Sequence, residues 1–245
     1  MCHADLDRTS GKRQDNGHPA EIAALSEKGE GRQILLVPEL NSHLMERRLA
    51  AATHNHGART AEVLTFSRLA DRVFSEVGGL AQQMLTPAGQ LLTLQEAARR
   101  VQAAECVEGS GGQAGAAAGG AALIDECKTC AVAPETLFAA AEESEDAVLA
   151  EKLSDLAQIL TAYERLCEES LPDPRDRLTY LRDRLAESHT LDGAAVYLDG
   201  FLGFTVQESA VVDAMLAAGV PLSAAVTCDT DYPEISLPAV KQCRN

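Results

Sequence analysis

An acidic residue directly follows one of the most apolar stretches of the chain. The run Val196-Tyr197-Leu198 leads into Asp199 and then Gly200. Ligands of open parallel sheets bind beyond the carboxyl ends of the strands, and a P-loop enzyme holds its Mg²⁺ with an Asp in this place. Asp199 is therefore a candidate metal or nucleotide ligand at a position like that of the second Walker motif. The alternative is a turn residue that caps local backbone N–H groups, because Gly200 cannot supply the second acid that orients water.

A degenerate phosphate-binding loop lies close to the start of the sequence. Gly11-Lys12 matches the Gly-Lys pair of a P-loop, whose backbone N–H groups and Lys side chain hold the phosphates of ATP. However, Arg13 stands where a Ser or Thr hydroxyl should hold Mg²⁺, and Leu6 stands where the first Gly belongs. ATP with Mg²⁺ is thus a possible cofactor, and Gly11, Lys12 and Asp199 are the candidate residues of a degenerate binding site. The alternative is a disordered polar segment over residues 1–30.

A third candidate site follows the second apolar run of the chain. Ser67 and Arg68 come directly after Phe66, at the expected start of a helix. A hydroxyl and a guanidinium at a helix N-terminus can bind a phosphate, so both residues are candidate DNA-binding residues. Alternatively, Ser67 only caps the helix and Arg68 is a surface charge.

The cysteines offer one suggestive spacing, Cys127-Lys128-Thr129-Cys130, which a zinc site or a redox pair could use. No second close Cys or His pair follows it, and the segment before it reads as helix rather than strand. We therefore interpret Cys127 and Cys130 as ordinary helix residues and expect no metal here. The chain has seven cysteines, an odd number, and its polar start is not a secretory signal. We therefore expect no disulfide framework and a cytoplasmic location.

Composition limits the remaining classes. The 21 basic and 37 acidic residues give 21 − 37 = −16, which argues against strong, independent binding to nucleic acid. Trp is absent and aromatic residues make up only 4%, so a base-stacking platform is not expected. No window approaches about 18 consecutive apolar residues, so we expect no membrane span.

The hydrophobic pattern predicts an α/β protein with a parallel sheet. The order is strand, helix, strand, a helical block of about a hundred residues, strand, helix, strand. Within the block, the low-complexity stretch 108–122 is predicted to be a flexible loop, and leucines recur at helical spacing over 149–167. The predicted strands are 33–38, 61–66, 194–201 and 222–227, and the predicted helices begin near Ser42, Ser67, Thr86, Pro134, Leu149, Asp173 and Thr205.

These elements suggest three parts. Residues 1–85 would form the first part of a nucleotide-binding domain, residues 86–190 a helical insertion, and residues 191–245 the return to that domain. The order of the strands in the sheet does not follow from the sequence.

Several segments, taken in order, carry a resemblance to a known family. They are Ile34–Glu39 with Glu46-Arg47 and Leu49, Glu62–Ala70 with Arg72–Phe74, Glu126–Lys128 with Pro134-Glu135 and Leu137, Lys152-Leu153 with Asp155-Leu156, and Val196–Phe201 with Phe204-Thr205 and Gln207-Glu208. This ordered set resembles the N-terminal part of the B subunit of the AddAB helicase–nuclease, an ATP-dependent helicase/deoxyribonuclease. The resemblance covers residues 33 to 229.

The resemblance implies a RecA-like, P-loop NTPase-like parallel sheet with a large α-helical insertion. It also implies a partner, the A subunit of the helicase–nuclease, together with which the B subunit unwinds and resects DNA in double-strand break repair and recombination. In this family the helicase-like part of the B subunit is a degraded motor that grips DNA. Its nuclease domain and iron–sulfur cysteines lie far beyond the matched region, so no cluster is expected here.

One departure concerns hydrolysis. Active helicases of this superfamily have Asp-Glu-x-Gln-Asp at the second Walker motif, whereas this chain has Asp199-Gly200-Phe201-Leu202-Gly203. The sequence also ends near the fourth predicted strand, before the second RecA-like domain that a motor needs. We therefore expect a piece of a longer chain that is not catalytic alone, serves as a DNA-path and partner scaffold, and reaches DNA through the complete heterodimer. The alternatives are an active ATP-binding protein that uses Lys12 and Asp199, and a CxxC metal or redox protein.

Overall fold

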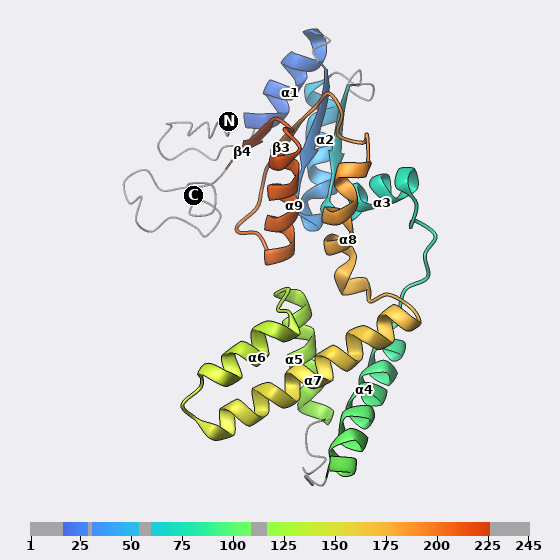
Figure 1. Cartoon of the computed structure of the whole chain (residues 1–245). Helices are drawn as coiled ribbons and strands as arrows, with labels where there is room; N and C mark the ends of the chain where they lie inside the picture. Colours follow the sequence, from blue (N-terminus) through green and yellow to red (C-terminus); the bar gives the residue numbers. More distant parts are fainter. Residues whose placement is uncertain (1–16, 29–30, 54–59, 109–116, 226–245) are drawn as a thin grey trace. The chain divides into compact units, whose positions relative to one another are not determined.

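The computed structural model of the protein describes residues 17–28, 31–53, 60–108 and 117–225 (Figure 1). The chain divides into two compact units. Unit 1 combines Met1–Leu80 with Leu178–Asn245, and unit 2 is Ala81–Arg177.

Unit 1 contains a four-stranded sheet in which all neighbouring strands are parallel. The strands are β1 (Arg32–Leu36), β2 (Ala61–Leu64), β3 (Ala194–Leu198) and β4 (Leu222–Ala224), in the order β2-β1-β3-β4. The register aligns Ile34 of β1 with Glu62 of β2 and with Val196 of β3. The predicted α/β class with a parallel sheet is thus confirmed, and the sequence patterns located all four strands.

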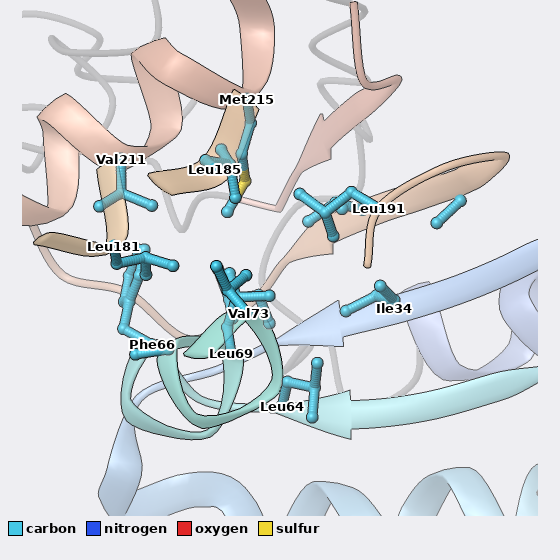
Figure 2. Packing of buried hydrophobic residues seen from close by; sticks show 14 of the residues in the cluster. Ile34, Leu64, Phe66, Leu69, Val73, Leu181, Leu185, Leu191, Val211 and Met215 are labelled. Carbon is cyan, nitrogen blue, oxygen red and sulfur yellow. The ribbon is translucent and has the colours of Figure 1, made fainter. Parts of the chain in front are cut away.

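Helices pack on both faces of this sheet. On one face, α1 (Gly17–Lys28) and α2 (Ser42–Ala52) pack against alternate residues of the strands, including Leu35 and Tyr197. On the other face, α3 (Phe66–Val77), α8 (Arg177–Arg184) and α9 (Val206–Ala217) pack against Ile34 and its neighbours (Figure 2). Burial on both faces explains why the strands read as continuous apolar runs. Short 3₁₀ turns at Glu39–Asn41 and Leu185–Glu187 complete the unit.

The helix ends of unit 1 follow local side-chain chemistry. Thr205 and Glu208 form the predicted capping box at the start of α9, each side chain bonding the backbone N–H of the other. The prediction that Ser67 caps α3 is wrong, because Thr65 is the cap and its hydroxyl accepts from the Arg68 N–H at 3.3 Å. Thr65 has the extended backbone that an N-cap requires, whereas Ser67 already lies in the first turn.

Unit 2 is helical. It consists of α4 (Pro87–Glu108), α5 (Ala117–Thr129), α6 (Pro134–Glu143), α7 (Ala147–Glu169) and a 3₁₀ turn at Pro174–Asp176. Helices α4 and α6 both pack on α7, as Figure 1 shows. The predicted leucine stripe forms part of the core, in which Leu160, Tyr163 and Cys167 are buried.

One prediction in unit 2 is wrong in part. The stretch 108–122 is predicted to be a loop, but α5 begins at Ala117 inside it. Its residues 117–122 are Ala-Ala-Gly-Gly-Ala-Ala, and alanine is the strongest helix former, which offsets the two glycines. None of the helices within the described residues is both long and apolar enough to cross a membrane.

Candidate functional site

The carboxyl ends of β1 and β3 lie side by side at a point where the chain turns to opposite sides of the sheet. After β1 the chain returns to β2 on one side, and after β3 it returns to β4 on the other. Such a switch point is where open parallel sheets bind ligands. The residues that follow the two strands, Pro38 and Glu39 after β1 and Asp199 and Gly200 after β3, therefore form the candidate functional site.

Asp199 lies at this edge, as the sequence predicted. Its backbone N–H donates to the Leu36 carbonyl at 3.1 Å, which fixes the end of β3 against the end of β1. The Asp199 residue is half-buried, so its carboxylate sits at the rim of the sheet rather than in the core.

The residue after Asp199 is confined to glycine. Gly200 has a φ of +79°, in the left-handed region that L side chains rarely adopt. A Cβ built there would also lie 3.0 Å from Nδ2 of Asn41 and 3.6 Å from Cδ of Pro38. The backbone conformation thus disfavours a side chain at Gly200, and the Asn41 side chain would have to shift to admit one.

Glu39 links the ends of β1 and β2. Its partial burial would raise the pKa of its carboxyl, but hydrogen bonds from Ser67 and Thr65 and the nearby charge of Arg68 outweigh that effect and lower the pKa. Glu39 therefore stays ionised, and its carboxylate accepts a hydrogen bond from the Ser67 hydroxyl. This role was not predicted from the sequence, although Glu39 directly follows a predicted strand and the same reasoning that selected Asp199 could have found it.

Ser67 and Arg68 lie at the same edge, in the first turn of α3. Ser67 is exposed, and the guanidinium of Arg68, whose side chain is 41% exposed, pairs with the carboxylate of Glu46 on α2. The hydrogen bond from Arg68 is the main cause that lowers the pKa of Glu46. A phosphate that binds Arg68 must therefore compete with Glu46. Because β1 separates β2 from β3, Ser67 and Asp199 lie at the ends of strands that are not adjacent.

Two exposed leucines accompany these polar groups. Leu40 follows β1 and is 97% exposed, and Leu202 follows β3 and is 71% exposed. Neither was identified from the sequence, since an apolar residue beside a strand reads as core. They give the edge a mixed apolar and charged surface.

Two other predicted features lie elsewhere. Gly11 and Lys12 fall outside the described residues. Cys127 is buried in α5 whereas Cys130 is exposed, and burial raises the pKa of the Cys127 thiol. A reactive or metal-binding thiol needs a lowered pKa, so this environment does not favour thiolate chemistry. Among the described residues, no group of three or more His, Cys, Asp and Glu side chains could hold a metal ion.

The fold and its edge define an α/β domain with a parallel sheet and polar residues at the strand ends. A family model described as "ADDB, N-terminal" matches residues 10–239, and the chain belongs to this family, the N-terminal region of AddB. The resemblance seen in the sequence is thereby confirmed.

Three relatives illustrate the match, and each is named as the B subunit of an ATP-dependent helicase/deoxyribonuclease. The protein from Desulforudis audaxviator is 39% identical over 201 residues, which cover 80% of this chain and 17% of that protein. The protein from Pelotomaculum thermopropionicum is 38% identical over 187 residues, covering 74% and 16%. The protein from Desulforamulus reducens is 32% identical over 209 residues, covering 84% and 18%. The chain thus spans less than a fifth of the length of these relatives.

Proposed function

We propose that this chain is the N-terminal helicase-like part of the B subunit of a helicase–nuclease that acts in double-strand break repair and recombination in the cytoplasm. In this role it is a degraded, RecA-like motor domain that serves as a DNA-path and partner scaffold. Its partner is the A subunit of the helicase–nuclease, which supplies the motor. Support comes from the relatives, which are named as the B subunit of an ATP-dependent helicase/deoxyribonuclease.

The main support for a loss of motor activity is the geometry of Gly200. ATP hydrolysis of this type needs an acid beside the Mg²⁺-binding Asp to orient the attacking water. At Gly200 an acidic side chain would strain the left-handed backbone, and its Cβ would lie 3.0 Å from Nδ2 of Asn41, whose side chain would have to shift. We therefore assign Asp199 a role in the turn rather than in catalysis.

The observation that favours a DNA path is the strand-end edge. Ser67 and Arg68 follow β2 at this edge, and the exposed residues Leu40 and Leu202 follow β1 and β3 at the same edge. The pairing of Arg68 with Glu46 and the net charge of −16 weaken the attraction of this chain for phosphate. Tight binding of DNA would therefore require cations from the A subunit or from other parts of the full-length AddB chain.

Equilibrium binding of ATP in the presence of Mg²⁺ tests the degraded motor. We expect the chain to show no tight ATP binding that depends on Lys12 or Asp199, so Lys12→Ala and Asp199→Asn should each behave as the parent does. Asp213→Asn, which removes an exposed carboxylate of α9, is the matched control. Tight ATP binding that Lys12→Ala or Asp199→Asn abolishes, while Asp213→Asn preserves it, would overturn the proposal in favour of an active ATP-binding protein.

A further inference from the structure

A buried carboxylate of unit 2, that of Asp173, accepts several hydrogen bonds. Its residue is 0% exposed, and it caps the 3₁₀ turn Pro174–Asp176. Oδ1 accepts from Nε2 of Gln90 and from the backbone N–H of Arg175, both at 2.9 Å. Oδ2 accepts from the Tyr163 hydroxyl at 2.7 Å and from Nη2 of Arg175 at 2.6 Å. The carboxylate thus receives donors from α4, from α7 and from its own turn.

These bonds join the two places where the chain enters and leaves unit 2. Gln90 lies in the first turns of α4, close to the entry at Ala81, and Asp173 lies close to the exit at Arg177. A backbone bond reinforces the junction, since the Leu85 N–H donates to the Pro172 carbonyl at 3.0 Å. The entry and the exit are therefore held together inside unit 2.

Helix α5 is tied to the same turn by ion pairs. Nζ of Lys128, whose side chain is 8% exposed, lies 2.9 Å from Oδ2 of Asp176 and 3.1 Å from Oε1 of Glu164 on α7. In addition, Nη1 of Arg175 donates to Oδ1 of Asp125 at 2.9 Å. All three helices that meet at this base, α4, α5 and α7, thus bond to the five residues 172–176.

Buried charges are costly unless each one is paired and hydrogen-bonded. Here every partner named above belongs to unit 2, so these bonds form within that unit. We propose that residues 172–176, with Asp173 at their centre, are a clasp that closes the base of the helical unit. The clasp makes Ala81–Arg177 a separate unit of unfolding, which opens without opening the sheet of unit 1.

Hydrogen exchange of the full chain tests the clasp, because it reports each unit separately. Asp173→Asn keeps the size of the side chain and removes its charge. We expect slow amides of α4, α5 and α7 to exchange at least roughly tenfold faster, while amides of β1 and β3 exchange as before. The matched control is Glu96→Gln, which removes an exposed carboxylate of α4 that pairs only with neighbouring arginines of the same helix.

Two results would overturn the proposal. One is faster exchange in both units to a similar degree, and the other is a change in unit 2 no larger than that of Glu96→Gln. If the Asp173→Asn chain does not fold, Tyr163→Phe decides, because it removes only one of the donors to Asp173. Faster exchange confined to unit 2 then supports the clasp, and uniform or unchanged exchange contradicts it.

Discussion

The two units use the same kinds of side chain in opposite ways. In unit 2, Asp173 and Arg175 pair with side-chain exposures of 0% and 20%, and further donors complete the bonding of the carboxylate. At the strand-end edge of unit 1, Arg68 and Glu46 pair with exposures of 41% and 39%. A buried, completed network specifies structure, whereas an exposed pair can exchange partners with a ligand at little cost. The difference fits a stabilising role for the clasp and the binding role that we propose for the edge.

The largest predicted loss of stability comes from removing the buried carboxylate of Asp173. Asp173→Ala leaves Arg175 and Tyr163 without their buried acceptor, so the free energy of unfolding of unit 2 should fall by about 3–5 kcal/mol. Asp199→Ala, at the half-buried edge of unit 1, should change stability by less than about 1 kcal/mol. Urea denaturation followed by circular dichroism measures both. Equal losses from the two substitutions would remove the distinction between the clasp and the edge.

A side chain at Gly200 should destabilise unit 1 by about 2–3 kcal/mol, because it combines a left-handed backbone with a close contact. Gly200→Glu also places an acid after Asp199, yet we expect it to create no ATP hydrolysis. Gly219→Ala is the matched control, since Gly219 has a φ of +76° but no atom near its Cβ position. A smaller loss for Gly200→Glu than for Gly219→Ala would contradict the close contact.

Acid should weaken the clasp of unit 2 only at low pH. Burial would raise the pKa of Asp173, but the hydrogen bonds from Arg175, Tyr163 and Gln90 lower it from 3.8 to about 2. Its stabilisation, about 2 kcal/mol, is therefore fully present above about pH 3.8 and is lost as the pH falls through about 2. Unit 2 should thus keep this contribution down to about pH 4 and lose roughly half of it by about pH 3. Loss of that contribution between pH 5 and 4, measured as the difference between parent and Asp173→Asn, would show that the carboxylate is not held ionised.

The smallest effect on stability should come from the exposed ion pair of Arg68 and Glu46. A double-mutant cycle of Glu46→Gln and Arg68→Gln should give a coupling energy below about 1 kcal/mol that decreases as salt is added. Thermal unfolding of the four proteins at low and high salt measures it. A salt-independent coupling above about 2 kcal/mol would mean that the pair is a structural element, as in the clasp, and that Arg68 is not available to a ligand.

The elements of this fold were largely predictable from local sequence. Continuous apolar runs such as Ile34-Leu35-Leu36 are typical of strands buried on both faces, and Pro87 and Pro134 stand at the first positions of their helices. Two local predictions were wrong. Thr65 rather than Ser67 caps α3, and alanines extend α5 into the stretch expected to be a loop. In the first case two neighbouring hydroxyl residues could both cap the helix, and in the second the helix propensity of alanine offset the glycines.

The sequence predicted single residues of the candidate site after each strand, but not the contacts between them. Asp199, Ser67 and Arg68 were found because each directly follows an apolar run, and parallel strands place such residues at one edge. The order β2-β1-β3-β4, the bond between Glu39 and Ser67, and the crowding of Gly200 by Asn41 depend on segments far apart in the chain. The same holds for Gln90 and Asp173, which are 83 residues apart in the sequence. No periodicity or motif records such pairs.

The most direct test of a scaffold that guides DNA without driving it uses the assembled helicase–nuclease, in which a full-length AddB chain containing these residues is paired with its motor partner. The dissociation constant for a DNA end and the ATP turnover per bound DNA are measured for Arg68→Ala and for Arg182→Ala, an exposed control in α8 of unit 1. The account predicts weaker DNA binding by several-fold for Arg68→Ala alone, with unchanged turnover per bound DNA. Unchanged DNA binding by Arg68→Ala, or a loss of turnover per bound DNA, would contradict it.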